Sequence, residues 1–258
     1  RKPADPARLP GQIRRVGGFG TPPQEVMTLV EYTEVARAES PRGEIVLRER
    51  RDPDAGPTAP VVLELRVNGV FVMDTLETSS EKGLASAALR QVEHPRDVVV
   101  GGLGLGFTMH EVLADKRVER LVVVEIEDAL VQWMRDGTIP HGPAYLADER
   151  VTVMTADIRV AMAEATPAAY DLVLLDVDNG PGFLVYDDNE AVYQREFLRQ
   201  VEECLRPGGA LVIWSAAESP ALQTELQDVF GRAVAVPFDV TLQSRDEHYW
   251  MYLARRSA

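Results

Sequence analysis

A glycine-rich loop follows the apolar run 97–100 and precedes a helix-like stretch that begins at Phe107. Glycine adopts positive φ without steric cost and lets the backbone approach a ligand closely, while the first turn of a helix has N–H groups without partners. Glu125 ends the next apolar run, nineteen residues past the last glycine of the loop, where a carboxylate can bind ribose hydroxyls. The pattern predicts a nucleoside site that includes Gly102, Gly104, Leu105, Gly106 and Glu125.

The kind of nucleoside follows from a missing glycine. A dinucleotide-binding loop has a third glycine three places after the second, and Phe107 stands at that position. Without this glycine, a pyrophosphate is bound less well. A nucleoside that carries no phosphate needs only the tight turn and the ribose-binding acid. The loop therefore favours S-adenosylmethionine, or a related sulfonium nucleoside, over NAD.

Two more apolar runs end in acids. Asp157 follows 151–155, where its carboxylate can accept a hydrogen bond from an adenine amino group or can cap the next helix. Ile126 and Ile158, which directly follow Glu125 and Asp157, belong to the same predicted site.

The fourth apolar run, 170–175, ends at Asp176 and continues into a loop with Gly and Pro. Catalytic groups are common where an acid leaves a buried strand, although acids in structural turns look similar. Asp176 and Asp178 are the candidate catalytic residues, and Asn179 is a candidate substrate-binding residue.

Composition is that of a globular enzyme. The 258 residues are 45% hydrophobic, and the net charge of −14 argues against a broad nucleic-acid surface. No apolar run is long enough to span a membrane, and four scattered histidines show no metal-binding spacing. The single cysteine, Cys204, excludes an internal disulfide and is expected in the core. We expect a cytoplasmic enzyme with a small-molecule substrate and no metal.

Strand and helix patterns alternate from residue 97 onward, which predicts right-handed βαβ crossovers and a parallel sheet. Strands are expected at 97–101, 120–125, 151–155, 171–176 and 209–214, with helices near 106–116, 127–136, 158–165, 189–206 and 219–229. Segments 233–240 and 248–254 have no helix between them, so an antiparallel hairpin should end the sheet. The expected fold is α/β, Rossmann-like, of the class I methyltransferase type.

The segment before this core has the pattern of a small β domain. Short strand-like runs at 29–37, 44–51, 61–67 and 70–74 are separated by turn residues, and Asn68-Gly69 is a strong hairpin signal. The motif Thr78-Ser79-Ser80-Glu81 predicts a capping box for a helix that reaches about Val92. The expected division is a flexible extension over 1–27, a β domain over 28–76 and a nucleoside-binding catalytic domain over 77–258.

Taken together, segments 98–112, 124–127, 155–157 and 170–178, with the Asn68-Gly69 hairpin before them, resemble the spermidine synthase family of aminopropyltransferases over about residues 42–256. The resemblance implies a homodimer and a place in polyamine biosynthesis. It also implies that Glu125 binds the ribose, that Asp157 binds the adenine, and that Asp176 positions and deprotonates the attacking amine.

Three positions depart from the family pattern. Leu105 stands where a family aspartate binds the ammonium of decarboxylated S-adenosylmethionine, and Leu84 falls near a tyrosine that lines the polyamine channel. Asn179 replaces a later acid, for which Asp178 is a substitute one place earlier. An acid at position 105 would repel the carboxylate of intact S-adenosylmethionine, whereas leucine does not. Tyr249 is expected either to line the substrate site as part of an aromatic wall or to lie in the core.

Four functions are compatible with this pattern. The favoured one is transfer of a methyl or related alkyl group from S-adenosylmethionine to a small molecule, which releases S-adenosylhomocysteine when the group is methyl. The second is aminopropyl transfer from decarboxylated S-adenosylmethionine, which releases methylthioadenosine. The third is ring closure of the cofactor without an acceptor. The fourth is a binding protein without turnover.

Overall fold

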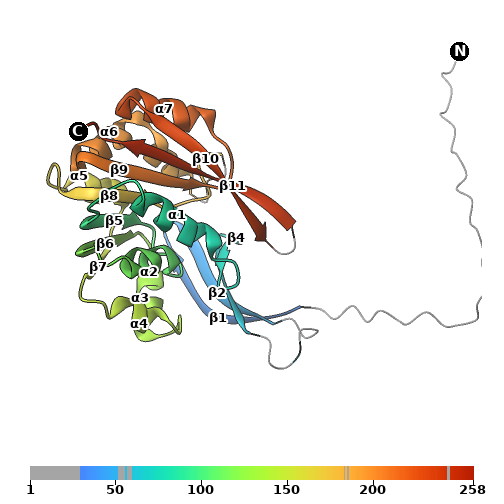
Figure 1. Cartoon of the computed structure of the whole chain (residues 1–258). Helices are drawn as coiled ribbons and strands as arrows, with labels where there is room; N and C mark the ends of the chain where they lie inside the picture. The colour runs from blue at the N-terminus through green and yellow to red at the C-terminus, as the bar shows by residue number, and fades with distance from the viewer. Residues whose placement is uncertain (1–29, 52–55, 57–59, 183, 185, 243–244) are drawn as a thin grey trace, which may run out of the picture.

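The computed structural model describes residues 30–51, 56, 60–182, 184, 186–242 and 245–258. The expected flexible extension over 1–27 lies outside these residues. The described chain forms two sheets, and the change from one to the other falls between Asp74 and Asp97, with one helix in between (Figure 1). The division into an extension over 1–27, a β domain over 28–76 and a catalytic domain over 77–258 stays a prediction.

The first sheet is antiparallel, with its four strands in chain order. The strands are β1 (Glu31–Ser40), β2 (Gly43–Arg51), β3 (Val62–Val67) and β4 (Val70–Asp74). Asn68 and Gly69 join β3 to β4 with φ of 50° and 76°. Positive φ at both central residues is what a tight two-residue hairpin turn requires, so the predicted Asn-Gly hairpin is confirmed.

The second sheet has seven strands in the order β10-β11-β9-β8-β5-β6-β7. They are β5 (Asp97–Gly101), β6 (Arg120–Glu125), β7 (Val151–Thr155), β8 (Tyr170–Leu175), β9 (Leu205–Ser215), β10 (Ala233–Leu242) and β11 (Arg245–Arg255). The five strands from β9 to β7 are parallel. Strand β11 is antiparallel to β9, and β10 is antiparallel to β11, so the two form an antiparallel hairpin at the end of the sheet. This arrangement confirms the predicted Rossmann-like fold with its terminal hairpin.

Helices cover both faces of this sheet (Figure 1). They are α1 (Ser79–Leu89), α2 (Phe107–Ala114), α3 (Asp128–Asp136), α4 (Gly142–Leu146), α5 (Ile158–Ala163), α6 (Arg195–Cys204) and α7 (Pro220–Phe230). Because side chains alternate along a strand, Val98 and Val100 join the core on the side of α1 to α3, whereas Val99 joins the core on the side of α5 to α7. Cys204 is buried in the second core, as predicted.

The structure differs from the predicted elements in three places. Helix α1 ends at Leu89 rather than near Val92. The single helix predicted over 189–206 is a 3-10 helix, η2 (Asp187–Tyr193), followed by α6, because Gln194 between them is extended. Helix α4 was not predicted, since five residues that begin Gly142-Pro143 are too short to show a helical period.

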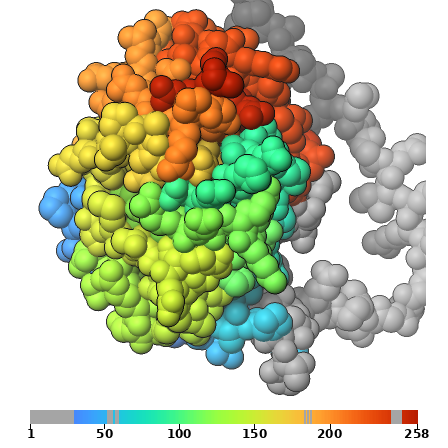
Figure 2. Space-filling model, turned by 60° about the vertical axis from the view of Figure 1, so that its left-hand side comes forward, coloured from blue at the N-terminus to red at the C-terminus, as the bar shows by residue number. Residues whose placement is uncertain are grey.

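The elements pack into one continuous body (Figure 2). In this view the dark red C-terminal residues lie at the surface, next to the orange segments of the second half of the chain. None of the helices in the described ranges combines the length and apolar character needed to cross a membrane.

Candidate functional site

A cavity of about 410 Å³ lies at the carboxyl ends of the parallel strands, where the first sheet and α1 close over them. Ligands of open α/β sheets bind at this edge. The residues that line it include predicted site residues from both halves of the chain: Gly102, Gly104, Glu125, Ile126, Asp157, Ile158, Asp176, Asp178, Asn179 and Tyr249. The structure thus brings most of the predicted site together, and their roles in binding and catalysis stay predictions.

The glycine loop joins β5 to α2 with its three glycines at positive φ: 93° at Gly102, 49° at Gly104 and 86° at Gly106. Most of the loop amides are already hydrogen-bonded within the protein. Gly102 N–H donates to the Val124 carbonyl (2.9 Å) and Gly106 N–H to the Leu103 carbonyl (2.8 Å). Of the five loop amides, only that of Gly104 makes no hydrogen bond to another described residue.

A side chain at Gly102 has no room. A Cβ there would lie 2.0 Å from the carbonyl oxygen of Asp176, at a φ that other residues rarely adopt. We expect Gly102→Ala to lower the free energy of unfolding by roughly 2–5 kcal/mol, through backbone strain and overpacking. Urea titration measures this. The control is Gly182→Ala, because a Cβ there has nothing within 4 Å; equal stability of the two variants would contradict the proposed crowding.

Glu125 is held by two backbone amides. Its Oε2 accepts from Leu103 N–H and its Oε1 from Glu127 N–H, both at 2.8 Å. The residue is only 7% exposed, and burial raises the pKa of its carboxyl group, while these hydrogen bonds oppose the shift. Each carboxylate oxygen keeps a second lone pair, so the group can still accept hydrogen bonds from two ribose hydroxyls.

The position of Asp157 is compatible with both expected roles, helix capping and contact with an adenine. It is the N-cap of α5, where it accepts a hydrogen bond from Arg159 N–H (2.8 Å), and it also lines the cavity. Burial opposes ionisation of Asp157, but hydrogen bonds from Arg159 outweigh it and lower the pKa of the carboxyl group. Asp157 is therefore an anion beside the predicted adenine position.

Asp176 follows β8 at the bottom of the cavity. Its Oδ2 accepts a hydrogen bond from Thr108 Oγ1 (2.7 Å), and burial raises the pKa of its carboxyl group against this bond. Asp178, two residues on, is buried and accepts hydrogen bonds from Asn179 N–H (2.6 Å) and Asn189 Nδ2 (2.7 Å). Of the two predicted catalytic acids, Asp176 is thus the one with more capacity left to bind a ligand.

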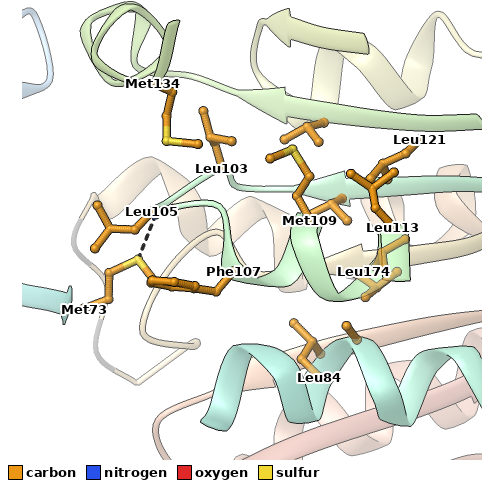
Figure 3. Packing of buried hydrophobic residues seen from close by; sticks show 14 of the residues in the cluster. Met73, Leu84, Leu103, Leu105, Phe107, Met109, Leu113, Leu121, Met134 and Leu174 are labelled. Carbon is orange, nitrogen blue, oxygen red and sulfur yellow. Dashed lines mark hydrogen bonds between the residues drawn. The ribbon is translucent and has the colours of Figure 1, made fainter. Parts of the chain in front are cut away.

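Three predicted positions do not line the cavity. Leu84 and Leu105 are completely buried, and Gly106 begins α2 behind the loop. Figure 3 shows Leu84 pointing from α1 toward α2, within the apolar core. The Leu84 side chain therefore packs in the core and does not line the cavity, so nothing in the structure supports its predicted role in substrate binding.

Leu105 also has a different surrounding from the one expected. Its side chain is in the core, its carbonyl accepts a hydrogen bond from His141 Nε2 (2.7 Å), and its N–H donates to Met73 Sδ (3.2 Å; Figure 3). The thioether of Met73 thus lies against the loop and lines the cavity.

Glu81 is a site residue that the sequence pattern concealed. The predicted capping box is wrong, because Thr78 occupies the N-cap position of α1 without a side-chain hydrogen bond. Glu81 instead lines the cavity, and its Oε2 accepts from Ser80 Oγ (2.8 Å). Burial, and then the charge of Asp176, raise the pKa of Glu81 to about 7.

Aromatic residues form another part of the wall. Trp214 at the end of β9 and Tyr249 on β11 both line the cavity, and their rings meet edge to face with centroids 4.9 Å apart. Of the two positions expected for Tyr249, in an aromatic wall or in the core, the structure thus shows the first. Trp214 was not predicted, because an aromatic residue within an apolar strand gives no signal that separates a wall from a core.

The first sheet reaches the nucleoside side of the cavity through Arg42, in the turn between β1 and β2. Arg42 Nε donates to Glu127 Oε1 (2.7 Å) and its Nη2 donates to the Ile126 carbonyl (2.8 Å). Glu127 is buried, and its Oε1 also accepts from Ser40 Oγ (3.3 Å) and Tyr186 OH (3.2 Å). These contacts join the turn, the loop after β6 and the segment before η2.

We expect Arg42→Met to weaken nucleoside binding about three- to tenfold, because a buried Glu127 that loses its charged partner costs roughly 1–3 kcal/mol, and only part of this cost reaches the nucleoside site. Isothermal titration calorimetry measures the change. Arg37→Met is the control, since Arg37 on β1 has only exposed ion pairs and such pairs contribute about 0–1 kcal/mol. An unchanged affinity in Arg42→Met would show that the turn does not support the nucleoside site.

The ionisable side chains of the cavity lining are mostly acids, and three of them, Asp74, Glu127 and Asp157, form ion pairs with arginines outside the lining. Among the described residues that line it, eight are acidic and none is Lys, Arg or His. The acids are Asp74, Glu77, Glu81, Glu125, Glu127, Asp157, Asp176 and Asp178. Such a lining favours cationic ligands. In the described part of the chain, no group of three or more His, Cys, Asp or Glu side chains is placed to hold a metal ion.

Comparison with known proteins gives a consistent result. The model of the spermine/spermidine synthase domain matches residues 77–239. Polyamine aminopropyltransferase 2 of Pseudomonas aeruginosa is 34% identical over 134 residues, which is 50% of this chain and 36% of the relative. Putrescine N-methyltransferase 3 of Nicotiana tabacum is 32% identical over 133 residues, which is 51% of this chain and 32% of the relative. The matched parts are thus about a third of the length of these relatives.

A solved structure of a spermidine synthase in complex with the transition-state analogue AdoDATO has the same fold. It matches with a TM-score of 0.70 at 18% identity, over 87% of this chain and 74% of that one. At this identity the similarity supports the fold alone.

Proposed function

Since the chain belongs to the spermine/spermidine synthase family, we propose that it is a transferase that uses a sulfonium nucleoside to alkylate a small amine. The observation that carries this proposal is the placement of Asp176 in the same acidic cavity as Glu125, Asp157 and the glycine loop. The sulfonium nucleoside, S-adenosylmethionine or a close relative, supplies a carbon activated by the positive sulfur.

Each part of the site has a role in this reaction. The tight turn at Gly102 and the lone pairs of Glu125 fit a ribose, and Asp157 accepts a hydrogen bond from the adenine amino group. Asp176 lies within reach of the same cavity, where it orients the acceptor amine and helps to remove its proton. Most of the rate gain comes from alignment of nitrogen with the reacting carbon, because the displacement needs little else from the protein.

Methyl or other alkyl transfer from intact S-adenosylmethionine is the favoured reaction. Leu105 provides no carboxylate that would repel the carboxylate of this donor, and a putrescine N-methyltransferase is among the similar proteins. S-adenosylhomocysteine is then the product of methyl transfer.

Aminopropyl transfer is the second candidate, and a specific observation favours it. The described lining contains no basic side chain, and the loop amide of Leu105 already donates to Met73. The carboxylate of intact S-adenosylmethionine therefore has few hydrogen-bond partners in the cavity. Decarboxylated S-adenosylmethionine has no carboxylate and needs no such partners. This reaction would release methylthioadenosine.

One experiment separates these functions. Calorimetric titration compares the two donors, and mass spectrometry follows each donor with putrescine and a panel of other small amines. S-adenosylhomocysteine with a methylated amine supports the first candidate, and spermidine with methylthioadenosine supports the second. Methylthioadenosine without any amine would indicate ring closure, and tight binding without turnover would indicate a binding protein.

The family resemblance also implies a homodimer in the cytoplasm, and we propose this assembly and location. Sedimentation velocity over a range of protein concentrations tests the assembly, and fractionation of the source cells tests the location.

A further inference from the structure

Glu81 is a buried acid that the proposed roles of the other residues leave unused. It is 8% exposed and lies on the first turn of α1. It lines the cavity together with Asp176, whose charge acts on it, so that the first turn of a helix and the end of a strand each contribute a carboxyl group to the lining. Ser80 Oγ, on the same turn, donates a 2.8 Å hydrogen bond to Glu81 Oε2.

The groups around Glu81 are acids, hydroxyls and apolar side chains. Asp176 follows β8 and Glu77 lies just before α1, and both charges act on Glu81. Strands β10 and β11 place the uncharged Phe238 and Met251 against the same turn of α1. Among the described residues that line the cavity, no cation balances these acids.

Two buried carboxyl groups without a cation repel each other when both are ionised, so they tend to share one proton or to bind a cationic ligand. Burial raises the pKa of Asp176, and the hydrogen bond that it accepts from Thr108 Oγ1 opposes this shift by favouring the ionised form. For Glu81, burial and the charge of Asp176 raise the pKa to about 7. A group with a pKa near the working pH is well suited to accept a proton in catalysis.

We propose that Glu81 and Asp176 together bind the nitrogen of the acceptor amine, and that Glu81 is the group that accepts its proton. The acceptor would then be a primary or secondary amine that enters as the ammonium ion. This inference rests on the proposed function, and it adds a second catalytic residue from α1 to the acid of β8.

The proton balance is as follows. The ammonium ion transfers one proton to the Glu81 carboxylate, which becomes a carboxylic acid. The freed nitrogen lone pair forms the bond to carbon while the bond from that carbon to sulfur breaks, and its electron pair stays on sulfur as a neutral thioether. The alkylated nitrogen carries the positive charge that the sulfur has lost. Asp176 remains ionised beside that nitrogen, and Glu81 returns its proton to water after product release.

The activity test compares wild type with Glu81→Gln, with putrescine as the acceptor probe and whichever donor supports turnover. We expect kcat to fall about a hundredfold, since a positioned base contributes roughly 10²- to 10⁴-fold, while the dissociation constant of the donor stays within about threefold. In the wild type, kcat/KM, which reports the free enzyme, should fall as the pH drops through about 7, and this limb should vanish in Glu81→Gln. Glu111→Gln is the control, because this acid on α2 faces Ser86 of α1 outside the cavity lining.

A second measurement needs no turnover. A carboxyl group whose pKa is raised in the folded chain binds its proton more tightly there, so folding becomes less favourable as the pH rises between the ordinary value of 4.5 and about 7. Thermal unfolding of the protein without substrate should show this decline, to which Glu81 contributes up to about three-hundredfold in the folding equilibrium constant. Glu81→Gln should show a smaller decline, due to Asp176 and Glu125, whose pKa values burial also raises. Saturating n-butylamine or putrescine should reduce the decline in the wild type.

The outcomes are distinct. If Glu81→Gln keeps the kcat and pH profile of the wild type, the proton-accepting role is wrong while the transferase proposal stands. If no amine is alkylated, the unfolding measurement decides whether Glu81 and Asp176 form an amine site. A pH dependence of stability that is smaller in Glu81→Gln and that the amine probes reduce supports the amine site, and a dependence that neither changes overturns it.

Discussion

Asp176→Asn lowers kcat for alkyl transfer by about three orders of magnitude, because asparagine can neither attract the ammonium of an acceptor nor help to remove its proton. The substitution keeps the shape of the side chain and leaves an acceptor oxygen for Thr108 Oγ1. The affinity for the donor nucleoside should therefore stay within about threefold of the wild type. Steady-state kinetics with the acceptor that supports turnover, combined with calorimetry of the donor, measures both quantities.

Asp188→Asn is the matched control. Asp188 is an exposed acid of η2, twelve residues further along the chain, and its side chain has no place in the cavity lining. We expect its kcat to equal that of the wild type. A full rate in Asp176→Asn would remove Asp176 from the reaction and leave Glu81 or Asp178 as the reactive acid.

Glu125→Gln lowers the affinity for the donor nucleoside by about a hundredfold. The carboxylate accepts one backbone N–H on each oxygen, and hydrogen bonds to charged groups contribute about 1.5–3 kcal/mol each. An amide keeps only one of these bonds and turns an N–H₂ donor toward a backbone N–H. The loop between β5 and α2 then loses the contact that holds Leu103, and the ribose loses an acceptor.

Calorimetric titration of the donor measures the loss, and circular dichroism checks that the variant is folded. Glu119→Gln is the control, since this exposed acid precedes β6 and forms only a surface ion pair with Arg96. Wild-type affinity in Glu125→Gln would show that the ribose is bound elsewhere in the cavity. Lower affinity together with a normal kcat at saturating donor would place Glu125 in binding alone.

Local chemistry explains which elements could be predicted. The Asn68-Gly69 turn, the glycine loop and the strands that end at Glu125 and Asp176 depend on conformational preferences and apolar patterns within a few residues. Because parallel strands place their carboxyl ends at one edge of a sheet, the amino-acid sequence alone was enough to predict that the acids at these ends lie together.

Residues whose roles depend on distant contacts could not be predicted. Arg42 meets Glu127 across 85 positions of sequence, and no local pattern marks either residue as a partner. Glu81 has the spacing from Thr78 that a capping box requires, so the sequence pattern predicts a cap. In the structure the start of α1 lies against the cavity, and the Glu81 side chain lines the cavity instead.

Leu105 shows a different limit of sequence comparison. Its place in the loop could be assigned from the motif, but the direction of its side chain depends on the backbone turns at the glycines on either side. Those turns send the side chain into the core and leave Met73, from the first sheet, at the position beside the loop. The side chain that the cavity presents beside this part of the loop thus comes from a residue 32 positions away.

The contact between Arg42 and Glu127 has a thermodynamic consequence. Because a ligand that binds only the assembled protein stabilises it by RT ln(1 + [L]/Kd), a donor at a hundred times its dissociation constant adds about 2.7 kcal/mol. We expect part of this binding free energy to stabilise the contact of the β1–β2 turn, through Arg42, with the loop after β6. By reciprocity, any change that loosens the first sheet from the second should lower the affinity for the donor, even when no residue at the nucleoside has been altered.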